Sequence, residues 1–155
     1  MTLYDKAKET SEFIKSKVKN IPTTAIVLGS GLGMFANETE KEVVLDYKDI
    51  PNFPLSTVPG HEGKLIFGKI EGKSIVAMQG RFHLYEGYTA EEVTFPVRVF
   101  QLLGVKNYIV TNASGAVNLS YKPGDLMIIE DHIGLFCESA LFGKNDERFG
   151  TRFPS

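Results

Sequence analysis

Three short apolar segments, each rich in β-branched residues, run directly into a polar loop that contains glycine. They are residues 23–28 (TTAIVL), 74–79 (SIVAMQ) and 107–111 (NYIVT), and the loops that follow begin GSGLG, GRFH and NASGA. Segments of this length and composition are typical of buried strands. If the three strands are parallel neighbours, their loops converge on one crevice at the carboxyl edge of a sheet. The pattern therefore favours an α/β protein that carries its chemistry at that edge.

Two helices are expected around these strands. Residues 3–18 carry an apolar face at helical spacing. In residues 89–103, Thr89 and Glu92 form a capping-box pattern, which predicts the start of the second helix. Pro96 is expected to kink this helix or to reset its start, because proline lacks the N–H of the helical ladder.

The remaining segments predict strands and loops. A β-hairpin is predicted over residues 64–79, with its turn at 71–73. Two further strands are predicted at 43–47 and 126–130. The polar residues 145–155 predict an exposed loop.

The composition excludes several classes of partner. The 155 residues suit one domain and carry a formal net charge of −2, which gives no reason to expect nucleic acid or an anionic membrane as partner. No apolar run approaches the roughly 20 residues of a membrane span, and no signal-peptide pattern is present at the N-terminus, so a cytoplasmic location is expected. Cys137 is the one cysteine, which excludes an internal disulfide, and it is expected to be a packing residue.

The loop after residues 74–79 gathers polar side chains within six positions. Arg81 offers a planar fork of donors suited to phosphate or carboxylate, and His83 points the same way in an extended chain. The pair is a candidate oxyanion site, although an Arg–Glu surface pair beside a packed tyrosine would explain the same pattern. His61 begins the hairpin, and because an antiparallel hairpin brings its outer ends together, it is expected beside Arg81 and His83.

The GSGLG loop at residues 29–33 is a second candidate for binding an anion. Its three alternate glycines let backbone N–H groups approach an anion, and Ser30 adds a hydroxyl donor. The loop is not a dinucleotide fingerprint, because Met34 stands where the last glycine would be and no helical pattern follows. It also lacks the lysine of a Walker loop. A tight turn without a ligand is the alternative.

Five motifs taken together resemble a known family. They are GSGLG at 29–33, VPGHEGKLIFG at 58–68, MQGRFHLYEGY at 78–88, TNASGAVN at 111–118 and NDERFGTRFP at 145–154. In this order and spacing, the chain resembles the N-terminal part of the trimeric purine nucleoside phosphorylases, the inosine–guanosine phosphorylases. The third motif is less similar to its form in the methylthioadenosine phosphorylases, which remain an alternative.

The resemblance implies a doubly wound α/β fold around a mixed sheet flanked by helices, with residues 1–155 as the N-terminal part of a single phosphorylase domain. It implies phosphorolysis, in which orthophosphate attacks the anomeric carbon of a purine ribonucleoside or deoxyribonucleoside and releases the base and the sugar 1-phosphate. Orthophosphate would be a co-substrate and no cofactor would be needed. We see no group of residues with the spacing of metal ligands.

The same resemblance assigns residues to the phosphate. Ser30, Arg81, His83 and the backbone N–H of Ala113 would bind it. His61 would lie beside the phosphate and orient it, so that His61 and His83 are the candidate catalytic residues.

The resemblance also assigns the ribose and base side of the site. Tyr85 would pack on the ribose, and Ala113, Ser114 and Gly115 would line the pocket through their backbone. Phe153 would reach into the site of a neighbouring subunit of a homotrimer.

The resemblance stops before the later part of the family's chain. In the family, that part supplies the groups that recognise and protonate the purine, so these groups cannot be placed on this sequence. Apolar faces of the sheet are expected to lie uncovered as a result. An inactive remnant that binds phosphate is therefore a second hypothesis.

Overall fold

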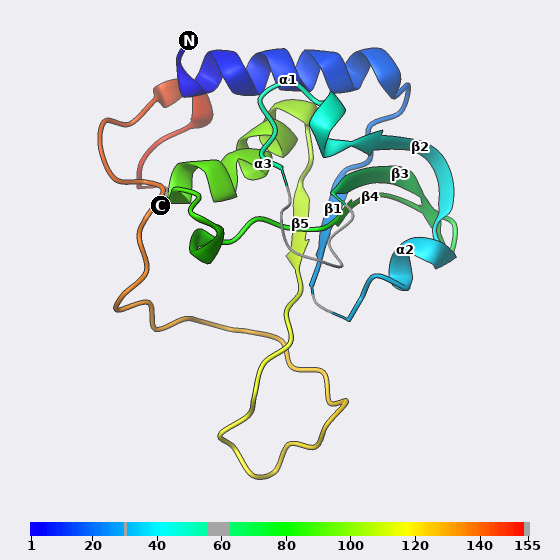
Figure 1. The fold of residues 1–155 in the computed structure, drawn as a ribbon, viewed down its shortest axis with the longest axis vertical. Helices are drawn as coiled ribbons and strands as arrows, with labels where there is room; N and C mark the ends of the chain where they lie inside the picture. The colour runs from blue at the N-terminus through cyan, green and yellow to red at the C-terminus, as the bar shows by residue number, and fades with distance from the viewer. Residues whose placement is uncertain (30, 56–62, 154–155) are drawn as a thin grey trace.

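A mixed five-stranded sheet forms the centre of this computed structural model, which describes residues 1–29, 31–55 and 63–153 (Figure 1). The strand order is β2-β3-β4-β1-β5. β1 pairs in parallel with both β4 and β5, whereas β3 pairs antiparallel with β2 and β4. The predicted set of three parallel strands is thus confirmed. The strands are β1 (Thr24–Leu28), β2 (Glu40–Asp46), β3 (Lys64–Ile70), β4 (Lys73–Gln79) and β5 (Asn107–Val110).

The predicted hairpin is present and has a tight turn. β3 and β4 pair from Lys64 opposite Gln79 to Ile70 opposite Lys73. Glu71 and Gly72 form the turn, with φ of 47° and 70°. A two-residue turn with positive φ at both positions matches the right-handed twist of the strands. The turn is one residue shorter than predicted, because Lys73 already pairs within β4.

Both long helices are present, and the capping box predicted for the second is confirmed. In α1 (Leu3–Lys17) the N-cap is Thr2, and in α3 (Ala90–Leu103) Thr89 and Glu92 form the expected capping box. Pro96 lies inside α3 and is buried, so the expectation that it resets the helix start is wrong. The helix continues through it because burial of the proline ring outweighs the missing hydrogen bond.

The shorter helices differ from the prediction at one place. The glycine loop is followed by α2 (Phe35–Glu38), where no helical pattern was expected. Three single-turn 3₁₀ helices complete the described elements. They are η1 (Tyr47–Asp49), η2 (Leu84–Glu86) and η3 (Glu147–Phe149).

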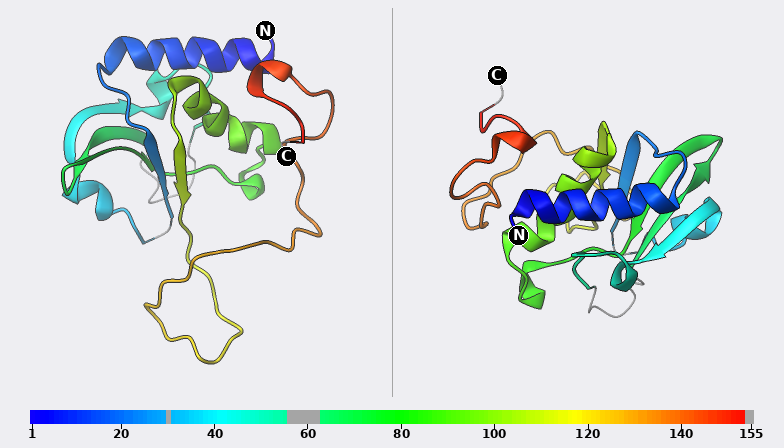
Figure 2. Two further views of the ribbon diagram at one scale, coloured as in Figure 1. Left: turned by 180° about the vertical axis from the view of Figure 1, so that it is seen from behind. Right: turned by 90° about the horizontal axis from the view of Figure 1, so that it is seen from above.

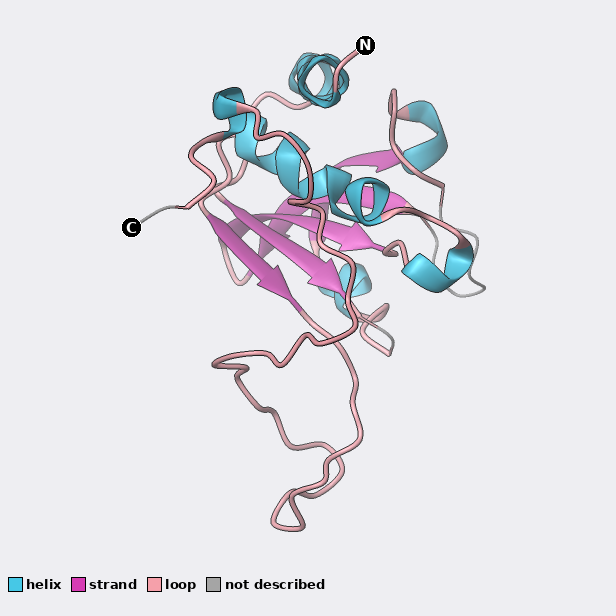
Figure 3. Cartoon of the chain, turned by 90° about the vertical axis from the view of Figure 1, so that its left-hand side faces the viewer, coloured by secondary structure: helices cyan, strands magenta, loops and turns pink. Residues whose placement is uncertain are grey.

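The two faces of the sheet carry cores of different size. Alternate residues of the strands, such as Val76 and Met78, face α1 and α3, which lie together on one side of the sheet (Figure 3). Ile75 and Ala77 face the other side, where a smaller cluster includes Ala36 of α2. The alternation follows from the two-residue repeat of a strand.

The chain beyond β5 departs most from the prediction. Residues 126–130 form no strand, and the described residues between β5 and η3 contain neither helix nor strand. This part leaves the body as a long loop, yellow to orange in Figure 1. Cys137 on this loop is exposed, so its expected role as a packing residue is wrong.

At the other edge of the sheet, β2 begins three residues earlier than predicted, because polar residues from Glu40 onward pair with β3.

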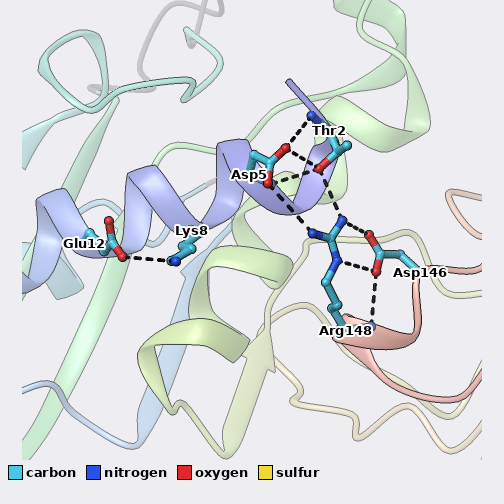
Figure 4. Close-up of polar contacts among 6 residues, drawn as sticks. All are labelled: Thr2, Asp5, Lys8, Glu12, Asp146 and Arg148. Carbon is cyan, nitrogen blue, oxygen red and sulfur yellow. Dashed lines mark hydrogen bonds and ion pairs between the residues drawn. The ribbon is translucent and has the colours of Figure 1, made fainter.

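Residues 145–153 return to the N-terminal end of α1 (Figure 2). The expectation of an exposed loop holds only in part, because Phe149 is buried beside Tyr4, with ring centroids 5.2 Å apart. Gln101 Nε2 donates a 2.6 Å hydrogen bond to the carbonyl of Phe149. The guanidinium of Arg148 lies over the Tyr4 ring. It also donates a hydrogen bond to the Asp146 carboxylate (Figure 4). These contacts fasten the segment to α1 and α3.

Candidate active site

The carboxyl ends of the three parallel strands lie side by side. Leu28 of β1 pairs with Gln79 of β4, and Val27 pairs with Val110 of β5. The residues that follow the strands therefore meet at one edge of the sheet, as the sequence predicted. This edge is the candidate site.

Thr111, directly after β5, ties the loops of β5 and β1 together. Its hydroxyl accepts a 2.8 Å hydrogen bond from Gly29 N and donates one of 2.9 Å to the carbonyl of Val27. A Cβ on Gly29 would lie 2.6 Å from the Thr111 carbonyl oxygen, so only glycine permits this approach. The N–H of Gly29 is thus engaged by Thr111, and this glycine serves the packing of two loops rather than direct binding of an anion.

Arg81 crosses from the β4 loop to the same threonine. Its Nη1 donates to the Thr111 carbonyl at 3.0 Å, and its Nε donates to Nε2 of His83 at 2.9 Å. The guanidinium is partly buried, and Arg81 and His83 face each other as the sequence predicted. A fixed cation at the end of three strands can hold an anion without a mobile side chain having to be ordered.

Glu86 holds the other side of His83. Its Oε1 lies 2.7 Å from Nδ1 of His83 and accepts a 2.9 Å bond from the backbone N–H of the same residue. Because Arg81 donates to Nε2, this nitrogen carries the lone pair and the proton is on Nδ1, directed at Glu86. The Glu86 side chain is only 3% exposed, and Tyr85 stacks on the histidine ring at 4.5 Å between centroids. The ring is therefore fixed in both tautomer and orientation.

Tyr47 supports the loop that carries Arg81. Its hydroxyl donates a 2.6 Å hydrogen bond to the carbonyl of Gly80, and this bond is buried. Burial raises the pKa of the Tyr47 phenol well above its usual range, so the group stays protonated and remains a donor. Gly80 has a φ of 116°, a conformation that a residue with a side chain rarely adopts. The turn into Arg81 thus depends on this glycine and on a buried hydrogen bond.

The other predicted site residues fall into two groups. Ser30 and His61 lie outside the described residues, so their expected positions beside the phosphate stay predictions. Ala113, Ser114 and Gly115 follow Thr111 on an exposed loop. Phe153 lies beyond η3, is 86% exposed and belongs to none of the hydrogen-bonded contacts around Arg81 that the structure describes.

Two residues of the site were given no role by the sequence reasoning. Glu86 could have been found by its distance of three residues from His83, which one turn of 3₁₀ helix brings together. Thr111 carries no local signal, because its partners come from β1 and from the β4 loop.

Within the described ranges, no group of three or more His, Cys, Asp or Glu could hold a metal ion. In the same ranges, no helix has the length and apolar character needed to cross a membrane.

Comparison with known proteins agrees with the resemblance. The sequence profile described as "Phosphorylase superfamily" matches residues 23–155. Purine nucleoside phosphorylase 1 of Geobacillus stearothermophilus is 53% identical over 147 residues, covering 95% of this chain and 54% of the relative. The protein of the same name from Bacillus subtilis (strain 168) is 53% identical over 150 residues, covering 97% of this chain and 55% of the relative.

A solved structure shows the same arrangement of elements. Isoform 2 of purine nucleoside phosphorylase from Schistosoma mansoni, in complex with cytosine and ribose-1-phosphate, superimposes with a TM-score of 0.88 at 44% identity. The match covers 98% of this chain and 54% of that one. This chain spans about half the length of the relatives that it matches, and it corresponds to their N-terminal part. With the fold, the profile and the relatives in agreement over nearly all of its residues, the chain belongs to the phosphorylase superfamily.

Proposed function

We propose that this chain takes part in the phosphorolysis of purine nucleosides, and that its described residues supply the side of the site that binds orthophosphate. The observation that carries the proposal is the contact from Arg81 to His83 and Thr111 at the end of three parallel strands. It occurs in a chain that matches purine nucleoside phosphorylases at 53% identity over nearly its whole length. The net charge of −2 means that an anion site must be local, and Arg81 provides the local cation.

Phosphorolysis suits a site of this composition. Cleavage of the bond between base and sugar builds positive charge on the ribose ring, so a phosphate fixed beside the anomeric carbon stabilises the transition state electrostatically. Positioning the phosphate converts an encounter of two molecules into a reaction within one complex. Arg81 would hold the phosphate without removing its charge, since a guanidinium never gives up its proton to it.

His83 would border the same phosphate. In the structure its Nε2 accepts a hydrogen bond from Arg81 and its Nδ1 faces the Glu86 carboxylate. Glu86 would hold the imidazole ring beside Arg81 in the orientation that the phosphate site needs.

The remaining assignments extend the proposal beyond the Arg81 site. Ser30, His61 and the Ala113 N–H would complete the phosphate site, and Tyr85, with 76% of its surface exposed, would pack on the ribose. Ser114 and Gly115 would border the base. The proposal includes a homotrimer in which Phe153 enters a neighbouring site. It also includes a cytoplasmic location. The exposed position of Phe153 is compatible with such a contact.

The test measures binding and turnover separately. Titration of the chain with inorganic phosphate in a calorimeter should give saturable heat, and Arg81→Ala should weaken phosphate binding at least about tenfold, because it removes charge-assisted hydrogen bonds. Lys41→Ala removes the same charge from the exposed part of β2 and should leave the affinity unchanged. Release of hypoxanthine from inosine is then followed with and without phosphate.

The outcomes distinguish the hypotheses. Phosphate-dependent turnover supports the full activity for this chain alone. Phosphate binding without turnover supports the phosphate-binding role and leaves the chemistry to a longer assembly, and equal phosphate affinity of the wild type and Arg81→Ala contradicts the site. Cleavage of methylthioadenosine in preference to inosine would favour the related family instead.

A further inference from the structure

Tyr47 connects the two ends of the β3–β4 hairpin at the candidate site. Its backbone N–H donates a 2.8 Å hydrogen bond to the carbonyl of Gly63, directly before β3. Its hydroxyl donates one of 2.6 Å to the carbonyl of Gly80, directly after β4. Gly63 N in turn donates to the carbonyl of Gln79 at 2.9 Å. The Tyr47 side chain is 1% exposed, so its hydroxyl lies inside the protein, where the loss of a donor leaves a buried carbonyl without a partner.

The Gly80 carbonyl controls the direction in which the chain enters Arg81. The carbonyl of one residue and the N–H of the next lie in one peptide plane, so fixing the Gly80 oxygen also fixes the N–H and the Cα of Arg81. Gly80 has a φ of 116°, and glycine has few steric limits in this region because it lacks a Cβ. A hydrogen bond is therefore needed to select one orientation of the plane, and Tyr47 supplies it.

The ring of Tyr47 holds the same segment by packing. Its centroid lies 5.3 Å from that of Phe82 and 5.0 Å from that of Phe53. Phe82 is buried, whereas Arg81 and His83 on either side of it are only partly buried, so alternate side chains of this segment face the core and the site. Phenylalanine at position 47 would keep these ring contacts. The contribution of the hydroxyl can therefore be tested by itself.

We propose that Tyr47 is a positioning residue of the candidate phosphate site. Its hydroxyl fixes the Gly80 carbonyl, and this carbonyl sets the direction of the Arg81 side chain. The guanidinium can then reach His83 and Thr111 together. Tyr47 acts through the backbone of the Arg81 loop and not on the phosphate itself. The inference rests on the proposed binding of phosphate at Arg81 for its effect on affinity, whereas its effect on the geometry of the site does not depend on that function.

The test compares two replacements that each remove one buried hydroxyl and keep the shape of the side chain. Tyr47→Phe removes the donor to Gly80. Thr10→Val is the matched control, because the Thr10 hydroxyl is also buried and donates to a backbone carbonyl, that of Pro51 at 2.7 Å, outside the Arg81 loop. Both variants should melt at a lower temperature than the wild type. In calorimetric titration with inorganic phosphate, the affinity should be at least about threefold weaker in Tyr47→Phe and within about 1.5-fold of the wild type in Thr10→Val.

A second measurement reports on the geometry of the site without phosphate. The nitrogen chemical shifts of the His83 ring depend on its tautomer and on the hydrogen bonds that its two nitrogens make. These signals are identified by their absence in His83→Asn. They should move in Tyr47→Phe, because Arg81 no longer donates to Nε2 in the same geometry, and should stay in place in Thr10→Val. A loss of stability alone leaves them unchanged in the folded protein.

The outcomes separate this proposal from the proposed function. Unmoved His83 signals, equal losses of affinity in Tyr47→Phe and Thr10→Val, or full affinity in Tyr47→Phe while Arg81→Ala binds weakly would overturn the positioning role. If the wild type binds no phosphate, or Arg81→Ala binds it equally well, the proposed function fails, and the His83 signals alone then decide whether Tyr47 positions Arg81. If Tyr47→Phe does not fold, Gly80→Ala disturbs the same peptide plane and replaces it in both measurements, with the same expected results.

Discussion

Thr111 is the residue on which the geometry of the candidate site depends. Its hydroxyl joins the ends of β1 and β5, and its carbonyl receives the guanidinium of Arg81. One side chain of ordinary size therefore sets the distance between the glycine loop and the cation of the site. It touches no reacting atom, so its contribution is to position Arg81.

Replacing Thr111 with valine should weaken phosphate binding while the fold persists. Valine has the same shape but leaves the N–H of Gly29 without its acceptor. The loss of a hydrogen bond of this kind is worth ~1 kcal/mol, which corresponds to roughly a fivefold weaker phosphate affinity. Calorimetric titration with inorganic phosphate measures it, and the melting temperature of each variant is recorded beside it.

Thr111→Ser is the conservative control because it keeps the hydroxyl. Its phosphate affinity should stay close to that of the wild type, even if the lost methyl group lowers the melting temperature. If valine and serine variants lose melting temperature alike and neither changes phosphate affinity, Thr111 has a structural role only.

At the scale of single residues, the sequence predicted which residues lie in the site better than it predicted which groups they contact. The adjacency of Arg81 and His83 followed from their spacing along one strand extension, because that information is local. The glycines of residues 29–33 were interpreted as a loop that binds an anion or as a tight turn, and the N–H of Gly29 donates to the Thr111 hydroxyl, 82 residues away. Contacts across such distances leave no periodic trace in the sequence, so neither Thr111 nor the packing role of Gly29 could be predicted.

At the scale of elements, local signals determine the ends of α3, whereas packing determines its continuation through Pro96. Its start is fixed by a reciprocal pair, since Glu92 N donates to the Thr89 hydroxyl and Thr89 N donates to the Glu92 carboxylate. Gly104 ends it with a φ of 89°. These signals are local and were readable in advance. The continuation through Pro96 depends on burial of the ring against the rest of the core, which no local rule contains.

Thr89→Ala should lower the free energy of unfolding by ~1 kcal/mol, the usual cost of removing an N-cap hydroxyl. The backbone N–H of residue 89, the larger cause of the lowered pKa of Glu92, is kept, and the substitution removes only the hydrogen bond from the Thr89 hydroxyl to Glu92. Urea denaturation followed by circular dichroism measures the change. Thr89→Ser keeps a capping oxygen and should lose less than half as much, so equal stabilities for both variants and the wild type would exclude a role for the cap.

Strand predictions were correct where a neighbouring strand is available for pairing. The hairpin of β3 and β4 and the parallel set around β1 combine apolar alternation with neighbours that pair with them. Residues 126–130 have a comparable apolar composition but form no strand, because a strand must satisfy its backbone groups on a neighbour. Conversely, β2 includes the polar residues Glu40 and Lys41, which belong to the strand because they pair with Lys69 and Gly68 of β3.

At the scale of the whole molecule, residues near the two ends of the chain hold one another. Arg148 donates to both oxygens of Asp146, at 2.8 and 2.6 Å, and to the hydroxyl of Thr2 at 3.3 Å, with Asp5 3.8 Å away (Figure 4). These bonds from Arg148 hold the pKa of Asp146 below its usual range, and hydrogen bonds from Thr2 do the same for Asp5. Arg148, Asp5 and Thr2 are exposed and Asp146 is half-buried, so salt should weaken the contact.

The contact between the chain ends should therefore be sensitive to acid. A carboxyl group whose pKa is lower in the folded chain than in the unfolded chain adds stability above its usual pKa of 3.8, and this contribution disappears as the pH falls through the lowered value. Asp146→Asn should lower the melting temperature at pH 7, and the difference from the wild type should disappear as the pH falls through the lowered pKa of Asp146. Melting curves between pH 7 and pH 2.5 measure it.

Two comparisons show whether this acid sensitivity comes from the Arg148 contact. Asp131→Asn makes the same charge change on the exposed loop after β5 and should shift the melting temperature little at any pH. Proteolysis should cut the wild type between residues 140 and 150 faster at pH 3 than at pH 6 when the protease's own pH dependence is corrected with an unfolded peptide. The alternative result is a difference in melting temperature between Asp146→Asn and the wild type that stays constant down to pH 2.5. That result would mean that hydrogen-bond geometry, rather than the ionised carboxylate, holds Arg148 against α1.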